Sequence, residues 1–138
     1  MKKVLLGLCC TLVLTGCGGK TLTCTMSEKE NGMEMKQKVA LTFKDDKNVK
    51  GKMEVSIKIG DEGKEYLDLM KGMLDAAFEE YEEAGLKVDS KSKKNSLTIS
   101  VKYDVDKLTD ELKKDLDYSE TTYEETKKQL EDEGYTCK

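Results

Sequence analysis

The chain has 138 residues, with 24 lysine or arginine residues against 28 aspartate or glutamate residues, and it contains no histidine, tryptophan or proline. Without histidine, Ser-His and Cys-His nucleophile arrangements and ordinary zinc sites are excluded. The net charge of −4 disfavours nucleic-acid binding through phosphate neutralisation. It predicts a polar surface that mainly provides solubility.

The N-terminus has the features of a secretory signal. Lys2 and Lys3 precede an apolar run at residues 4–14, and this order is typical of a signal peptide. The run is too short to be a membrane-spanning helix, which needs about 20 apolar residues. The segment is therefore predicted to direct export.

Four residues at the end of the apolar run, Leu14, Thr15, Gly16 and Cys17, resemble the lipobox of bacterial lipoproteins. The resemblance implies that residues 1–16 are a lipoprotein signal peptide. It also implies that the Cys17 sulfur carries a diacylglycerol group with palmitate-type chains. Buried methylenes contribute about 0.8 kcal/mol each, so two or more chains hold a domain on a membrane. We expect the protein to be lipid-anchored on the extracytoplasmic face of a bacterial membrane.

The expected mature chain begins with a short connection to the anchor. Residues 17–20 comprise the lipidated cysteine and a tether, and the tether reaches roughly 10 to 14 Å when extended. Residues 21–138 are predicted to form a single domain. Removing residues 1–16 leaves 122 residues, the size of one domain with one core, and a net charge of about −6.

Two cysteines remain for a disulfide. Cys9 and Cys10 lie in the signal and Cys17 is the expected lipid site, which leaves Cys24 and Cys137. An extracytoplasmic compartment permits their pairing. The bridge would close a loop of 113 residues and stabilise the fold by roughly 4.7 kcal/mol in the chain-entropy model. A redox-active or metal-binding thiol pair is the alternative, but the two cysteines are far apart in sequence and no histidine assists them.

The first half of the domain reads as three strands. Residues 21–26 alternate apolar side chains with threonines, and the Asn-Gly dipeptide at 31–32 favours a tight hairpin. Residues 33–43 predict a second strand and residues 44–48 a turn. Residues 49–59 alternate apolar residues with mainly lysines, which predicts a third strand with one buried face.

The middle of the chain changes to helical periodicity. Apolar residues recur every three or four positions over residues 61–84, with Asp61 as the expected N-cap and Gly85 as the stop. Residues 86–89 and 96–105 alternate again and predict a hairpin around the six polar residues between them.

The C-terminal part predicts two helices. Leucines every four residues over 108–116 mark a short helix, and Thr122 with Glu125 resembles a capping box that opens another helix through Leu130. Gly134 ends this helix. The order β-β-β-α-β-β-α-α predicts an α+β fold, with an antiparallel sheet of about five strands and helices packed on one face.

No sequence motif assigns a catalytic or metal site, and no cofactor is expected. The leading interpretation is a non-enzymatic binding or accessory module of unknown ligand. The alternatives are a carboxylate-based extracytoplasmic enzyme and a methionine-dependent metal carrier. The acidic pairs are expected to be solvated and the methionines to pack in the core; they are Glu79-Glu80, Glu82-Glu83, Glu124-Glu125, Met33, Met35, Met70 and Met73.

The lipobox, the strand-rich start Thr-Leu-Thr-Cys-Thr-Met at residues 21–26 and the ending Lys-Lys-Gln-Leu-Glu-Asp-Glu-Gly-Tyr at residues 127–135 resemble the YehR-like family of small bacterial lipoproteins. The function of that family is uncharacterised. The resemblance implies an α+β lipoprotein domain and supplies no catalytic residues. The pairing of Cys24 with Cys137 is not a general feature of that family.

Overall fold

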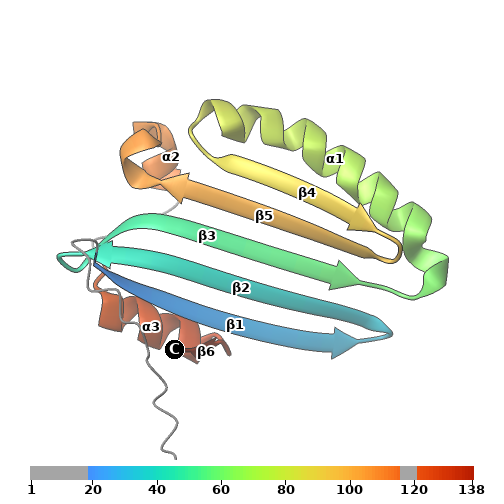
Figure 1. Cartoon of the computed structure of the whole chain (residues 1–138), viewed down its shortest axis with the longest axis horizontal. Coiled ribbons are helices and arrows are strands. Elements are labelled where there is room, and N and C mark those ends of the chain that lie inside the picture. Colours follow the sequence, from blue (N-terminus) through green and yellow to red (C-terminus); the bar gives the residue numbers. More distant parts are fainter. Residues whose placement is uncertain (1–18, 116–120) are drawn as a thin grey trace, which may run out of the picture.

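The computed structural model describes residues 19–115 and 121–138, and their strands form one open antiparallel sheet in the order β4-β5-β3-β2-β1-β6 (Figure 1). The α+β class and the predicted order of elements are confirmed, and a short sixth strand is added at the C-terminus. The elements are β1 (Lys20–Glu30), β2 (Met33–Lys44), β3 (Lys47–Lys58), a 3-10 turn (Asp61–Gly63), α1 (Lys64–Glu83), β4 (Lys87–Lys93), β5 (Ser96–Asp104), a second 3-10 turn (Val105–Lys107), α2 (Asp110–Asp115), α3 (Tyr123–Asp132) and β6 (Thr136–Cys137).

The first two hairpins turn where the sequence predicts. Asn31 and Gly32 both have positive φ, at 50° and 79°, as a two-residue hairpin between β1 and β2 requires. Asp45 and Asp46 adopt φ of 52° and 59° between β2 and β3. Short polar side chains tolerate this left-handed region better than most others.

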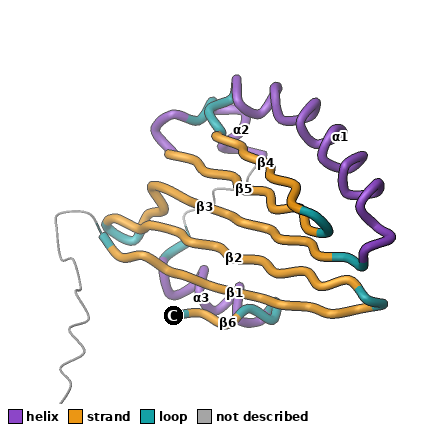
Figure 2. The backbone as a smooth tube through the Cα atoms, turned by 45° about the vertical axis from the view of Figure 1, so that its right-hand side comes forward, coloured by secondary structure: helices purple, strands orange, loops and turns teal. Residues whose placement is uncertain are grey.

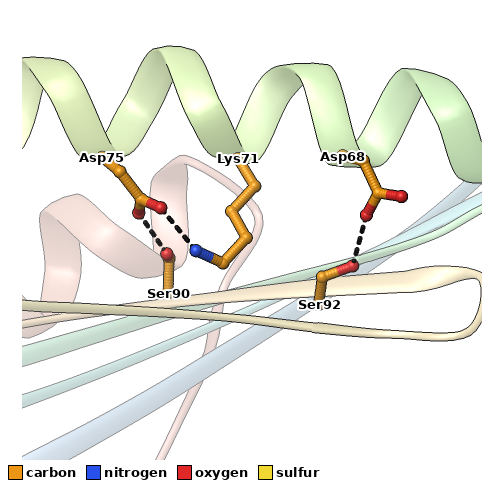
Figure 3. Close-up of polar contacts among 5 residues, drawn as sticks. All are labelled: Asp68, Lys71, Asp75, Ser90 and Ser92. Atoms are coloured by element: carbon orange, nitrogen blue, oxygen red, sulfur yellow. Dashed lines mark hydrogen bonds and ion pairs between the residues drawn. The ribbon is translucent and has the colours of Figure 1, made fainter.

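The hairpin of β4 and β5 is longer than predicted. The polar segment 90–95 was expected to be a turn, but β4 continues to Lys93. Ser90 and Ser92 point towards α1, where Ser90 Oγ donates to Asp75 and Ser92 Oγ donates to Asp68 Oδ1 at 3.1 Å (Figure 3). Serines therefore occupy the positions of β4 that face α1. Because these positions are polar, the alternation of apolar residues in the sequence does not predict this part of the strand.

All three helices contact the same face of the sheet, as predicted. Directly opposite residues of an antiparallel pair lie on one face, so the strand register defines the two faces. α1 lies along the β4 edge and α3 beside β1 and β6 at the other edge (Figures 1 and 2). The short helix α2 packs on the end of β4 and β5 through Leu112.

The buried core is divided between these helices. Leu22, Cys24 and Phe43 form one cluster against α3, where the rings of Phe43 and Tyr123 meet edge to face with centroids 5.5 Å apart. Leu86, Leu108 and Leu112 form the other around α2.

Three methionines are more exposed than the sequence predicts. Met33 is 42% exposed and Met73 67% exposed, although both were expected in the core, and Met53 is 46% exposed. The reason is that the helices lie at the two edges of the sheet, so that central strands and the upper side of α1 remain uncovered (Figure 2).

The helix ends agree with the sequence except at the start of α1. Thr122 and Glu125 form the expected capping box, with Thr122 N donating to Glu125 Oε2 at 2.9 Å. Gly85 and Gly134 have positive φ beyond α1 and α3. The prediction of Asp61 as N-cap is wrong, because Asp61 lies inside the 3-10 turn and its side chain forms no capping hydrogen bond. Within the described residues, no helix is long and apolar enough to span a membrane.

The disulfide joins the two ends of the described domain. Cys24 in β1 lies directly opposite Cys137 in β6, with Sγ–Sγ at 1.99 Å and a sequence separation of 113 residues. Cys24 is fully buried. Next to it, the backbones of Thr23 and Lys138 exchange hydrogen bonds of 3.2 and 2.9 Å. The bridge therefore closes almost the whole fold into one loop.

We expect reduction of this disulfide to lower the free energy of unfolding by about 4 to 5 kcal/mol, because a loop of this length strongly restricts the unfolded chain. Urea unfolding with and without a thiol reductant measures the change. The Cys24→Ala/Cys137→Ala variant is the control, since reductant should leave its unfolding midpoint unchanged. An identical midpoint for the wild type in both conditions contradicts the prediction.

The polar contacts between α1 and β4 make a second prediction. Hydrogen bonds from Lys71 and then from Ser90 hold the pKa of Asp75 below its ordinary value of 3.8 (Figure 3). Because the folded-state pKa is lowered, these contacts stabilise the fold above pH 3.8 and are lost as the pH falls through the folded-state pKa. We expect Ser90→Ala to raise the pKa of Asp75 in a side-chain carboxyl NMR titration. Ser92→Ala, which removes the bond to Asp68 instead, should leave it unchanged, and an ordinary pKa for Asp75 in the wild type would refute the assignment.

Candidate functional site

The sheet face opposite the helices carries most of the positive charge of the sheet. The helices contact Leu22, Phe43, Val88, Ser90 and Ser92, which lie on the other face. We call the surface of strands β1–β5 on the side opposite to these residues the open face. Apart from Lys44 and Lys47, the pair beside the β2–β3 turn, its register rows contain ten exposed lysines: Lys29, Lys36, Lys38, Lys50, Lys52, Lys58, Lys87, Lys91, Lys93 and Lys102.

Only four acidic residues accompany these ten lysines, which gives the open face a charge of +6. They are Glu34, Glu54, Asp89 and Asp104. α1 has the opposite balance, with seven acidic residues and two lysines, a charge of −5. The two signs of charge are thus segregated onto opposite sides of the molecule, although the whole chain has a net charge of only −4. The expectation that the surface mainly provides solubility misses this separation.

Each acidic residue of the open face is already paired. Glu34 lies 3.0 Å from Lys36 and Glu54 lies 3.1 Å from Lys52, and Lys36 is the main cause of a lowered pKa at Glu34. Asp89 pairs with Lys91 at 3.1 Å, and Asp104 lies 3.9 Å from Lys50. The acidic side chains therefore leave a surplus of lysine charge available to a partner.

At one end of the open face, lysines surround a hollow of about 330 Å³. Lys52 in β3, Lys102 in β5 and Lys87 in β4 lie directly opposite one another across the three strands. Lys50 and Lys107 complete the set, and we call this cavity the lysine hollow. Within the described part of the chain, Lys87, Lys102 and Lys107 form no ion pair within 4 Å.

The strands beneath the hollow are held by an aromatic contact on their helix side. Tyr103 lies opposite Gly51, and a Cβ placed at Gly51 would come within 2.2 Å of the Tyr103 ring. Tyr103 Oη also donates to Asn48 Oδ1 at 3.1 Å. Only glycine at position 51 permits this close packing of β5 on β3.

A second hollow of about 330 Å³ lies at the opposite end of the same face. Lys36, Lys58, Lys93 and Lys94 line it together with Glu34. The hydrogen bond from Lys36 lowers the pKa of Glu34. This hollow therefore presents a carboxylate engaged by one of its own lysines.

The predicted site residues fall into three groups according to where they lie in the structure. Leu14, Thr15, Gly16 and Cys17 lie outside the described residues. Cys24 and Cys137 are brought together as the predicted disulfide. The acidic pairs of α1 and α3 are exposed, as expected.

Sequence reasoning missed the open face as a site, although one signal was visible. Lysine fills several outward positions of the predicted third strand, including Lys50, Lys52 and Lys58. The period of two in a strand places these lysines on one side of the sheet.

Among the described residues, the carboxyl groups with a shifted pKa lie on separate elements. The carboxyl groups with shifted pKa are Glu34, Asp75 and Glu125, and each pKa is lowered. They lie on β2, α1 and α3. The described residues also contain no group of three or more cysteine, aspartate or glutamate side chains suited to hold a metal ion.

Comparisons with known proteins add little to this description. No family model matches the chain, and no curated protein matches it. An NMR structure of a protein from Streptococcus pneumoniae TIGR4 aligns over 100% of this chain and 97% of that chain, with 20% identity and a TM-score of 0.49. The likeness to the YehR-like family stays a prediction.

The row of three opposed lysines predicts a stabilising substitution. Like charges directly opposite each other destabilise a sheet, and Lys102 lies between Lys52 and Lys87. We expect Lys102→Gln to raise the free energy of unfolding by about 0.5 kcal/mol at low ionic strength. Lys36→Gln is the matched control, because it loses a 3.0 Å ion pair with Glu34 and should give no gain. The account fails if urea unfolding shows Lys102→Gln to be the less stable of the two variants.

Proposed function

We propose that this protein is a lipid-anchored, extracytoplasmic binding module whose open face binds an anionic partner. The observation that carries the proposal is the segregation of ten lysines and four paired acidic residues onto the sheet face that none of the described helices contacts. A binding role needs no catalytic group, and it uses the largest charge feature of the fold.

The magnitude of the charge supports a real attraction. Each lysine near an anionic membrane surface contributes about 1 kcal/mol. Interactions between exposed charges are screened over about 8 to 10 Å at moderate ionic strength. A layer of packed secondary structure is about 10 Å thick. The acidic outer side of α1 is therefore about one screening length away and offsets only part of this attraction.

The proposed anchor, Cys17, is close in sequence to the end of the sheet where the lysine hollow lies. Cys17 precedes Lys20, the first residue of β1, by three residues, which span at most about 11 Å. The row that contains Thr21 crosses Thr42 and Lys50 to Asp104, so β1 begins at the end of the sheet where the lysine hollow lies (Figure 1). A lipid on Cys17 would keep this end near the headgroups.

The rival interpretations have less support. A carboxylate-based enzyme needs two neighbouring groups whose pKa values are displaced in opposite directions, whereas the shifted carboxyl groups are separated and all have lowered pKa values. The methionine-dependent metal carrier stays an untested alternative, and the exposure of Met33 and Met73 is the feature in its favour.

The charge argument against nucleic-acid binding does not apply to the open face. A surface of this charge attracts polyanions in general. The prediction of no nucleic-acid partner therefore now depends on the proposed extracytoplasmic location rather than on net charge.

The anchor is tested by metabolic labelling of the full chain with palmitate in a bacterial host. We expect the wild type to be labelled and to fractionate with membranes, and Cys17→Ser to lose the label because the acylated thiol is gone. Cys9→Ser/Cys10→Ser is the matched control, since it also removes thiols from the N-terminal segment and should keep the label. An unlabelled wild type, or equal labelling of the Cys17→Ser variant, contradicts the proposed anchor.

A further inference from the structure

We infer that the lysine hollow is a binding site for a phosphate group, presented by the headgroup of an anionic phospholipid. The phospholipid source rests on the proposed function, whereas the preference for a phosphate group depends on the hollow alone. Three observations carry the inference: the convergence of its lysines, the lack of internal partners for three of them, and its place in the sheet.

The lysines of the hollow come from four separate parts of the chain. Lys52, Lys102 and Lys87 extend from adjacent positions on β3, β5 and β4, and Lys50 and Lys107 border the same cavity. An ammonium group binds phosphate oxygens as a compact charge with three donors. Side chains fixed on paired strands present these charges from a rigid base.

The charge of the hollow exceeds what its own carboxylate can neutralise. Asp104 is the acidic residue among the lining residues, and it lies 3.9 Å from Lys50. Lys52 has Glu54 at 3.1 Å on its own strand. For Lys87, Lys102 and Lys107, the described residues supply no ion pair, so a bound anion would relieve the repulsion across the row.

The dimensions suit a headgroup. A volume of about 330 Å³ is at the lower end of the range for small-molecule sites. Ala40 and Thr42 of β2 form the side of the hollow nearest to β1. The lysines of the row lie on β3, β5 and β4, which are two to four strands from β1. With neighbouring strands about 4.8 Å apart, the start of β1 lies roughly 10 to 20 Å from them. The proposed lipid anchor on Cys17 would therefore hold the hollow at the depth of the headgroup phosphates.

The second hollow provides an internal comparison on the same face. It has a similar volume and four lysines, but Glu34 lies within it and takes one lysine at 3.0 Å. It also lies at the end of the sheet away from the start of β1. If an anion were attracted only by the total charge of the open face, it would bind equally well at both hollows. The site proposed here predicts stronger binding at the lysine hollow.

The test compares the full chain with two triple variants that remove the same charge. Lys87→Gln/Lys102→Gln/Lys107→Gln removes three positive charges from the lysine hollow. Lys36→Gln/Lys58→Gln/Lys93→Gln removes three positive charges from the second hollow. Binding is measured by co-sedimentation with phosphatidylglycerol vesicles and with phosphatidylcholine vesicles. The difference between the two lipids isolates the anionic contribution, because any apolar contribution from residues 1–16 is common to all chains. Circular dichroism and melting temperature establish that each variant is folded.

We expect the wild type to prefer phosphatidylglycerol, and the first variant to lose at least about tenfold more affinity than the second, because it also loses charge-assisted hydrogen bonds to the phosphate. Equal losses in both variants would overturn the hollow as a site while leaving the open face as an anion-binding surface. No preference of the wild type for phosphatidylglycerol would overturn the phospholipid as the source of the phosphate group.

A second arm separates the lipid from a free anion. Inorganic phosphate is titrated into the wild type at constant ionic strength, and the melting temperature is followed. We expect millimolar phosphate to stabilise the wild type and the second variant but not the first, in line with a weak site for the isolated group. Phosphate binding without a preference for phosphatidylglycerol vesicles would overturn the phospholipid as the source of the phosphate group. Displacement of the protein from the vesicles by a soluble phosphodiester polymer, at equal phosphate concentration, would overturn it too.

Discussion

The alternation of side chains along paired strands is the constraint on which the rest of this structure depends. Successive residues of β1–β5 point to opposite faces, and the three helices contact one of these faces. The other face faces solvent, and apart from Ala40 its paired residues are polar or charged. Because lysine occupies most of the charged positions on this face, the residues that point away from the helices form a broad basic surface. The acidic residues of α1 lie on the other side of the sheet.

This arrangement has a cost in stability that a ligand would offset. The row of Lys52, Lys102 and Lys87 opposes three like charges on neighbouring strands, and the disulfide between Cys24 and Cys137 stabilises the opposite edge of the same sheet. The buried core is divided into clusters beneath helices at the edges of the sheet. In such a fold a covalent link between the two ends of the domain contributes a large share of the total stability.

Much of the fold could be predicted from the sequence, because local signals decide it: the alternation of residues 49–59, the Asn31-Gly32 turn and the capping box at Thr122. The end of β4 could not, since Ser90 and Ser92 are inward residues satisfied by carboxylates of α1. The candidate site was also out of reach. Lys52, Lys87 and Lys102 are far apart along the chain, and only the insertion of β5 between β3 and β4 brings them into one row. The net charge of the chain does not indicate this arrangement, because it adds the positive charges of the open face to the negative charges on the helix side.

Lysine acetylation footprinting tests the central claim most directly. The wild-type chain is treated with an amine-reactive acetylating reagent with and without phosphatidylglycerol vesicles, and the modification of each lysine is measured by mass spectrometry. The account predicts that vesicles protect Lys52, Lys87 and Lys102, while Lys64 in α1 and Lys128 in α3 react as before. Protection of the helix lysines instead, or equal protection of all five, would contradict the assignment of the open face as the binding surface.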